Sequence, residues 1–183
     1  MIVSDAQQDI RRAYVGGGPG VVTSGTVWLA AALALQWRGT GFGFAVLFLG
    51  GMLIFPLSTL ACRAIFRRER EASDNPLGMT ALESTIAMIG GLFAAWLLLP
   101  LKPALVFPLA AIAVGTHYAA FKTVYGDRLF WALAAVITAI GLVDILVAPI
   151  PGGVAFPVAL IELTFGIVLT LRATRTNRRE VVV

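Results

Sequence analysis

Residues 41–62 read GFGFAVLFLGGMLIFPLSTLAC, and none of these 22 side chains carries a charge. An α-helix needs about 20 such residues to cross the ~30 Å hydrocarbon core of a bilayer. Strands of a membrane β-barrel would instead alternate apolar and polar residues over about 10 positions, and this run does not alternate. The stretch therefore predicts an α-helix that spans a membrane.

Five further long apolar runs lie along the chain. They cover residues 19–37, 79–99, 104–121, 129–148 and 154–171. Apolar side chains make up 58% of the 183 residues and charged ones 13%, whereas a soluble domain has about 45–50% and about 25%. A soluble protein of this size could not cover so much apolar surface. We expect an all-α, polytopic bundle of six transmembrane helices, arranged as three hairpins within one domain over residues 19–171.

The fourteen Lys and Arg residues indicate how the helices are oriented. With six spans, the loops on one side of the membrane hold only Arg38 and Lys102. The other side holds the remaining twelve: Arg11, Arg12, Arg63, Arg67, Arg68, Arg70, Lys122, Arg128, Arg172, Arg175, Arg178 and Arg179. Because basic residues accumulate in cytoplasmic loops, we expect both termini in the cytoplasm. Residues 1–18 would then form a short cytoplasmic segment, and residues 172–183 a basic cytoplasmic tail.

The positions of the charges also bear on partners. The net charge of +4 and the pI of about 9.8 would suggest nucleic acid in a soluble protein. Here the topology accounts for the excess, so no nucleic-acid partner is expected. The basic loops are expected to contact the bilayer through its anionic lipid headgroups, and self-association into a homo-oligomer stays open.

Four ionisable residues fall inside the predicted spans: Glu83, His117, Asp144 and Glu162. Each costs on the order of 2.5–3.5 kcal/mol to insert at the centre of a membrane helix, so such residues face the bundle and have partners. Glu162 is the deepest of the four. At helical spacing it shares a face with Ala155, Ala159 and Gly166, which predicts that it points at another helix.

The hairpin arrangement suggests two pairs among these residues. Folding the third and fourth spans about residues 101–102 brings His117 within reach of Glu83. Folding the last two spans near residue 151 brings Asp144 within a helical turn of Glu162. Such pairs could handle a proton or a cation, since histidine titrates near neutrality. The alternative is that each group makes its own structural hydrogen bond to a neighbour.

A second expectation concerns the third span. Ala87, Gly90 and Ala94 follow Glu83 at helical spacing and form a face of small residues. Small residues allow two membrane helices to approach closely. We therefore expect this face to contact another helix rather than lipid.

The sequence contains no complete catalytic, cofactor-binding or metal-binding motif. The glycine-rich run at residues 16–20 lacks the Lys-Ser/Thr ending of a phosphate-binding loop and no strand precedes it, so a hinge into the first span is expected. Neither a G-x-S-x-G nor an H-E-x-x-H sequence occurs, and one His with one Cys cannot build the usual zinc site. Two functions are favoured: a small permease coupled to protons or a cation, or a non-enzymatic accessory protein acting through helix contacts. A membrane enzyme ranks third.

Three short motifs carry a family resemblance. They are Asn-Pro-Leu-Gly at residues 75–78, Gly-Thr-His-Tyr at residues 115–118, and Ile161-Glu162 followed by an apolar stretch. Together they resemble an uncharacterised family of small bacterial integral membrane proteins with six spans. The resemblance implies a single six-span domain in the bacterial cytoplasmic membrane, and it implies no mechanism.

The orientation can be tested with reporter fusions. Fusions after residues 40, 101 and 151 are expected to report the outside of the cell, and a fusion after residue 183 the inside, because twelve of the fourteen basic residues then face the cytoplasm. Activity of alkaline phosphatase and fluorescence of a fused fluorescent protein distinguish the two sides. A C-terminal fusion that reports the outside would exclude the six-span topology.

Overall fold

The computed structural model describes residues 2–180, with side chains as far as residue 175, and its elements are all helical. They are α1 (Val3–Ala13), the 3₁₀ turn η1 (Val15–Gly17), α2 (Gly18–Arg38), α3 (Thr40–Ala64), α4 (Leu77–Leu97), the 3₁₀ turn η2 (Pro103–Leu105), α5 (Val106–Tyr125), α6 (Leu129–Leu146) and α7 (Ala155–Glu180). Helices α2 to α7 are long and apolar enough to cross a membrane. The predicted all-α fold is confirmed, and the protein is an integral membrane protein.

The last helix continues beyond its apolar part. α7 runs to Glu180, so residues 172–180 of the predicted basic tail extend the helix. The side chains of residues 176–180, with Arg178 and Arg179 among them, and residues 181–183 lie outside the described part of the chain.

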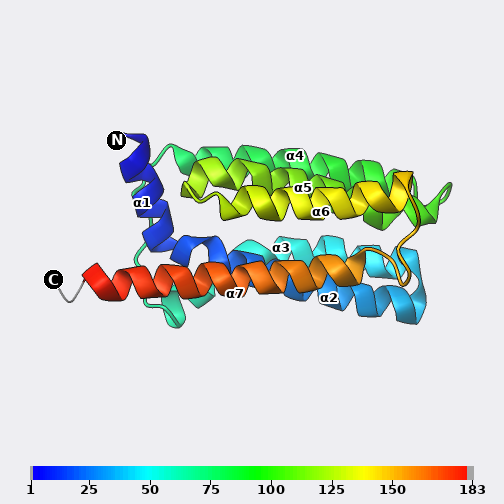
Figure 1. Cartoon of the computed structure of the whole chain (residues 1–183), viewed down its shortest axis with the longest axis horizontal. Coiled ribbons are helices and arrows are strands. Elements are labelled where there is room, and N and C mark those ends of the chain that lie inside the picture. Colours follow the sequence, from blue (N-terminus) through cyan, green and yellow to red (C-terminus); the bar gives the residue numbers. More distant parts are fainter. Residues whose placement is uncertain (1, 181–183) are drawn as a thin grey trace.

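The six long helices form two layers, α2, α3 and α7 in one and α4, α5 and α6 in the other (Figure 1). The chain connects them as three successive hairpins. However, α6 packs mainly on α5 and α7 mainly on α2, while α6 and α7 contact each other little. Helix α1 and the C-terminal part of α7 lie at one end of the bundle, here called the terminal end (Figure 1). The three hairpin turns lie at the opposite end, the turn end.

Glycines allow the closest helix contacts. A Cβ atom on Gly25 of α2 would lie 2.8 Å from the backbone nitrogen of Leu163 on α7, and one on Gly166 would lie 2.6 Å from that of Val22. Between α5 and α6, a Cβ on Gly115 would collide with Thr138. Since lipid tails are as apolar as the helices themselves, close packing of this kind is a main source of helix association in a membrane.

The face of small residues on α4 does not make such a contact, so this expectation was wrong. Ala87, Gly90 and Ala94 are all exposed, and a Cβ on Gly90 would meet no atom within 4 Å. It is the next residue, Gly91, that packs on α5, where its Cβ would lie 2.7 Å from that of Ala113. Small size on an apolar helix is a weak signal, because lipid accepts such a face as readily as another helix does.

Helix α1 lies across the terminal end of the bundle (Figure 1). It buries Ala6, Ile10 and Ala13 against the ends of the long helices. The chain then turns into α2 through the predicted hinge, where Gly17 has a φ of 80° and a Cβ would lie 2.9 Å from the rings of Tyr125 and Phe130. Both the backbone angle and the space require glycine there.

Replacement of two glycines by leucine tests this packing. Gly25→Leu is expected to destabilise the protein in detergent by about 1–3 kcal/mol or more, because the added side chain overpacks the contact of α2 with α7. Gly90→Leu is the matched control, since its side chain would enter open space. Thermal unfolding followed by circular dichroism should give a lower Tm for the first variant only. Equal effects of the two substitutions would contradict the packing described here.

Candidate functional site

Glu162 lies near the middle of α7 and is completely buried. Ala155, Ala159 and Gly166 on the same face are buried as well, and the face packs on α2 around Gly25. Both carboxyl oxygens are shielded, and neither accepts a hydrogen bond of good geometry from the described residues. A buried carboxyl with such weak partners is costly, which makes Glu162 a candidate functional residue.

Two hydroxyl groups lie beside the Glu162 carboxyl. They belong to Ser24 on α2 and Tyr118 on α5, and both side chains are buried. Both hydroxyls interact with the carboxyl, but neither forms a hydrogen bond of good geometry with it. We call these three residues the polar junction. It joins the two layers, because α2 and α7 belong to one and α5 to the other.

A cavity of about 310 Å³ lies against the polar junction. Ser24 and Tyr118 form part of its wall, and the remaining wall comes from α1 to α5 and the segment between α3 and α4. Most of the lining side chains are apolar or aromatic, with Trp28 and Phe121 among the largest. A space of this size with few polar groups is typical of a site for a small organic molecule.

Glu71 and Tyr14 line the cavity near the terminal end. Their side chains interact, with the Tyr14 hydroxyl beside the Glu71 carboxyl. Partial burial raises the pKa of Glu71 above its ordinary value. Burial of the Tyr14 side chain, together with the neighbouring Glu71 carboxylate, raises the pKa of Tyr14 to about 12. The terminal end of the cavity thus holds a carboxyl group whose negative charge is poorly solvated.

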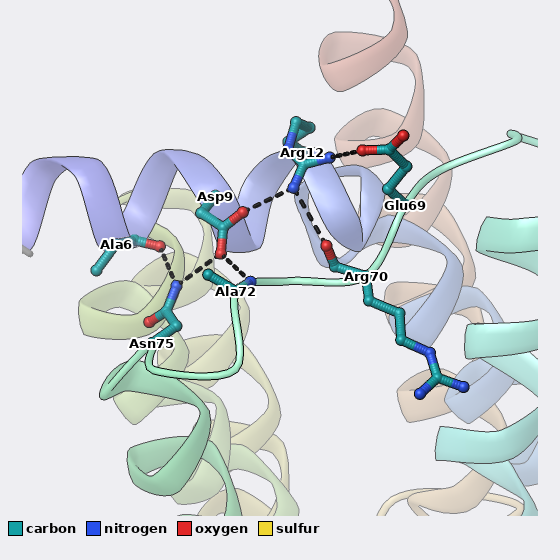
Figure 2. A network of polar contacts seen from close by, with 7 residues as sticks. All are labelled: Ala6, Asp9, Arg12, Glu69, Arg70, Ala72 and Asn75. Atoms are coloured by element: carbon teal, nitrogen blue, oxygen red, sulfur yellow. Dashed lines mark hydrogen bonds and ion pairs between the residues drawn. The ribbon is translucent and has the colours of Figure 1, made fainter.

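A network of polar contacts fixes the segment that carries Glu71 (Figure 2). Its centre is Asp9 on α1, whose carboxylate accepts hydrogen bonds from Arg12 Nη2 at 2.8 Å, the Ala72 backbone N–H at 2.8 Å and Asn75 Nδ2 at 3.0 Å. Partial burial raises the pKa of Asp9, but these donors and the Arg12 charge outweigh that effect, so its pKa lies below the ordinary value. The carboxylate is held in its charged form.

Asn75 links the same network to α4. Its Nδ2 also donates to the Ala6 carbonyl at 3.0 Å, and its Oδ1 accepts the Leu77 N–H at 3.0 Å. Asn75 therefore satisfies the first backbone N–H of α4, which begins at Leu77. Helix α1, the segment between α3 and α4, and the start of α4 form one connected unit at the terminal end (Figure 2).

His117 lines the cavity, but its partner is not Glu83, so that predicted pair was wrong. His117 Nδ1 lies 2.8 Å from the Oγ of Ser84, and its ring packs on Phe121 with the ring centroids 4.5 Å apart. Glu83 is exposed on the outer face of α4. The rotation of α4 that turns Gly91 towards α5 also turns Ser84 towards it, which directs Glu83 away.

Asp144 and Glu162 do not pair either. The Oδ1 of Asp144 accepts a hydrogen bond of 2.7 Å from the Ile150 backbone N–H, and the residue is half-buried. It stabilises the turn between α6 and α7. This is the alternative stated above, in which an ionisable residue makes its own structural hydrogen bond. The pair is absent because α7 packs on α2 rather than on α6, which points Glu162 at Ser24 and Tyr118.

Three residues of the site were not identified from the sequence: Ser24, Glu71 and Tyr118. A signal was present for Ser24, which is followed by Gly25 and lies one helical turn before Trp28 on the buried side of α2. Tyr118 lies next to His117 in an otherwise apolar part of its span. Nothing in the sequence around Glu71 indicates that a loop carboxyl reaches a cavity. Among the side chains of residues 2–175, no three of His, Cys, Asp or Glu gather as metal ligands would.

Comparisons with known proteins identify the family but supply no activity. No curated protein and no solved structure matches the chain. A family described as a family of unknown function (DUF7010) matches residues 3–172, which extend from the start of α1 into α7. The match covers most of the chain and agrees with the resemblance to uncharacterised membrane proteins. The chain belongs to this family of unknown function, DUF7010.

Proposed function

We propose that the protein is a small permease that couples the movement of a solute to that of a proton or a cation, with Glu162 as the coupling site. The observation that carries the proposal is the Glu162 carboxyl, which is completely buried, adjoins two hydroxyl groups in the wall of a cavity and accepts no hydrogen bond of good geometry from the described residues. An ionisable residue in this position within a membrane protein is a candidate for an ion or proton pathway.

The other acids of the protein support this interpretation by contrast. Asp9 accepts three hydrogen bonds and Asp144 accepts one, so each has a structural role that satisfies its charge. Glu162 has no such role among the described residues. A proton or a small cation can neutralise its charge, and release of that proton or cation would make the junction polar again. Binding and release would therefore change the stability of the contact between the two layers.

The position of the cavity fits alternating access. It lies between the layers, and transporters commonly move one group of helices against another around a site near the middle of the membrane. A solute in the cavity would touch Ser24 and Tyr118, which lie between it and Glu162. Occupancy of the cavity and of the carboxyl can then influence each other through the two hydroxyls.

The charge pattern supports a location in the bacterial cytoplasmic membrane with the terminal end inside. The basic residues at that end include Arg63, Arg67 and Arg70, which would contact anionic lipid headgroups. Under this orientation, Glu71 and Tyr14 stand at the cytoplasmic end of the cavity.

An accessory role is the second candidate, and the outer face of α4 favours it. Glu83 is exposed there together with Ala87, Gly90 and Ala94. A polar group beside small residues offers a close contact to a helix of another protein or of a second copy. This role needs neither the cavity nor Glu162, so the two candidates predict different effects of mutation.

Glu162→Gln is expected to abolish proton or cation movement coupled to a solute, because the amide keeps the shape of the side chain but cannot carry the charge change. The measurement uses proteoliposomes that contain a pH-sensitive dye, with an imposed gradient of protons or of Na⁺. A panel of neutral, anionic and cationic solutes is added outside. At least one solute should move protons or draw on the Na⁺ gradient with the natural sequence, and none with Glu162→Gln.

Glu83→Gln is the matched control, since it removes the same charge from a membrane helix but on the exposed face. It should keep the coupled movement, and both variants should keep the Tm of the natural sequence. Unaltered coupled movement in a folded Glu162→Gln protein would refute the proposal. Loss of a function through Glu83→Gln alone would favour the accessory role.

A further inference from the structure

The side chains that line the cavity favour a positively charged ligand. Aromatic side chains surround it: Tyr14, Trp28, Phe55, Tyr118, Phe121 and Tyr125. No Lys or Arg is part of the wall that the described residues form. The faces of aromatic rings attract cations, and quaternary ammonium groups are bound in proteins by such surroundings.

Two carboxyl groups lie near this aromatic space. Glu71 is part of the wall near the terminal end, and Glu162 lies behind Ser24 and Tyr118 at the polar junction. Two arginines, Arg63 and Arg68, interact electrostatically with Cys62 near the terminal end, but neither lines the cavity. The charge that a bound molecule would meet is therefore negative.

The exposed lining residues point to an opening of the cavity between α3 and α4. These helices contact each other little, and Phe48 and Phe93 bring them together towards the turn end with ring centroids 5.4 Å apart. Closer to the terminal end, Phe55 on α3 and Leu82 on α4 line the cavity while 66% and 50% exposed. Both lie inside membrane-spanning helices, so the opening faces the lipid. A ligand that enters there must dissolve in the bilayer.

We infer that the cavity binds a lipophilic organic cation, such as an aryl-substituted quaternary ammonium compound or a protonated alkylamine with an aromatic ring, that enters from the bilayer between α3 and α4. The aromatic wall receives its apolar part and its charge, and Glu71 balances that charge. This inference names the solute class of the permease proposed above and rests on that function for the transport step. Binding itself requires only the cavity and its carboxyl group.

The probe is phenyltrimethylammonium, and toluenesulfonate is an aromatic anion of similar size. Isothermal titration of the full-length protein in lipid nanodiscs measures both affinities. The cation is expected to bind at least about tenfold more tightly than the anion, a modest factor for combined cation–π and charge contacts. Binding of the two with equal affinity, or binding of neither, would overturn the inference.

Two substitutions in one loop separate a site effect from a general charge effect. Glu71→Gln is expected to weaken binding of the cation several-fold, because it removes the carboxylate from the cavity wall. Glu69→Gln removes the same charge from a side chain that is 89% exposed, and it should leave the affinity unchanged. Equal losses in the two variants, with unchanged Tm, would refute a role for Glu71 in a cation site.

The same two probes distinguish this inference from the proposed function. If phenyltrimethylammonium binds but no solute is moved in proteoliposomes, the cation site stands and the permease is refuted. If solutes are moved with coupling to Glu162 but only neutral or anionic ones, the permease stands and the cation site is refuted. If the cation binds and its movement depends on Glu162, both are supported.

Discussion

The close contact between α7 and α2 determines the arrangement of the candidate site. A Cβ atom on Gly25 or Gly166 would collide with the opposite helix, so the two backbones approach more closely than any larger residue would allow. This approach places Glu162 against Ser24 and directs it past α2 towards Tyr118 of the other layer. Had α7 packed on α6, its neighbour in sequence, Glu162 would have faced Asp144. Helix packing in lipid depends on such close fits because the hydrophobic effect does not favour contact with another helix over contact with lipid.

The acids of the protein differ in how their charges are satisfied, and this difference separates structure from candidate function. Asp9 ties α1 to the segment before α4 through the Ala72 N–H and the Asn75 side chain, and it also accepts a hydrogen bond from Arg12 of its own helix (Figure 2). Asp144 holds the turn before α7 through one backbone N–H. Glu162 is buried more deeply than either, yet its neighbours Ser24 and Tyr118 give it no hydrogen bond of good geometry. A fold can lower the cost of a buried carboxyl by giving it donors, and this fold leaves that arrangement incomplete beside a cavity.

A cavity lies beside the Glu162 carboxyl. It lies between the two layers, its wall is largely aromatic and apolar, and its exposed rim belongs to helices that cross the membrane. Glu71 closes one end, held in place by the network around Asp9 and Asn75. The members of DUF7010 have no assigned activity, and these features define which residues an assay should alter first. They also explain why His117 lines the cavity while bonded to Ser84, since both residues belong to the contact of α4 with α5.

The sequence by itself determined the fold class, the number of long helices and the inward direction of Glu162. Charge-free runs near 20 residues are stable as helices in lipid, and Ala155, Ala159 and Gly166 mark a face of α7 that can approach a neighbour. The tertiary structure alone decided the rotation of α4, the partners of His117, Asp144 and Glu162, and the cavity with Glu71 in its wall. In an apolar helix the side facing lipid and the side facing protein have the same composition, so periodicity does not report which is which. Contacts between α2 and α7, at opposite ends of the chain, depend on how all six helices pack together, and no local pattern contains that information.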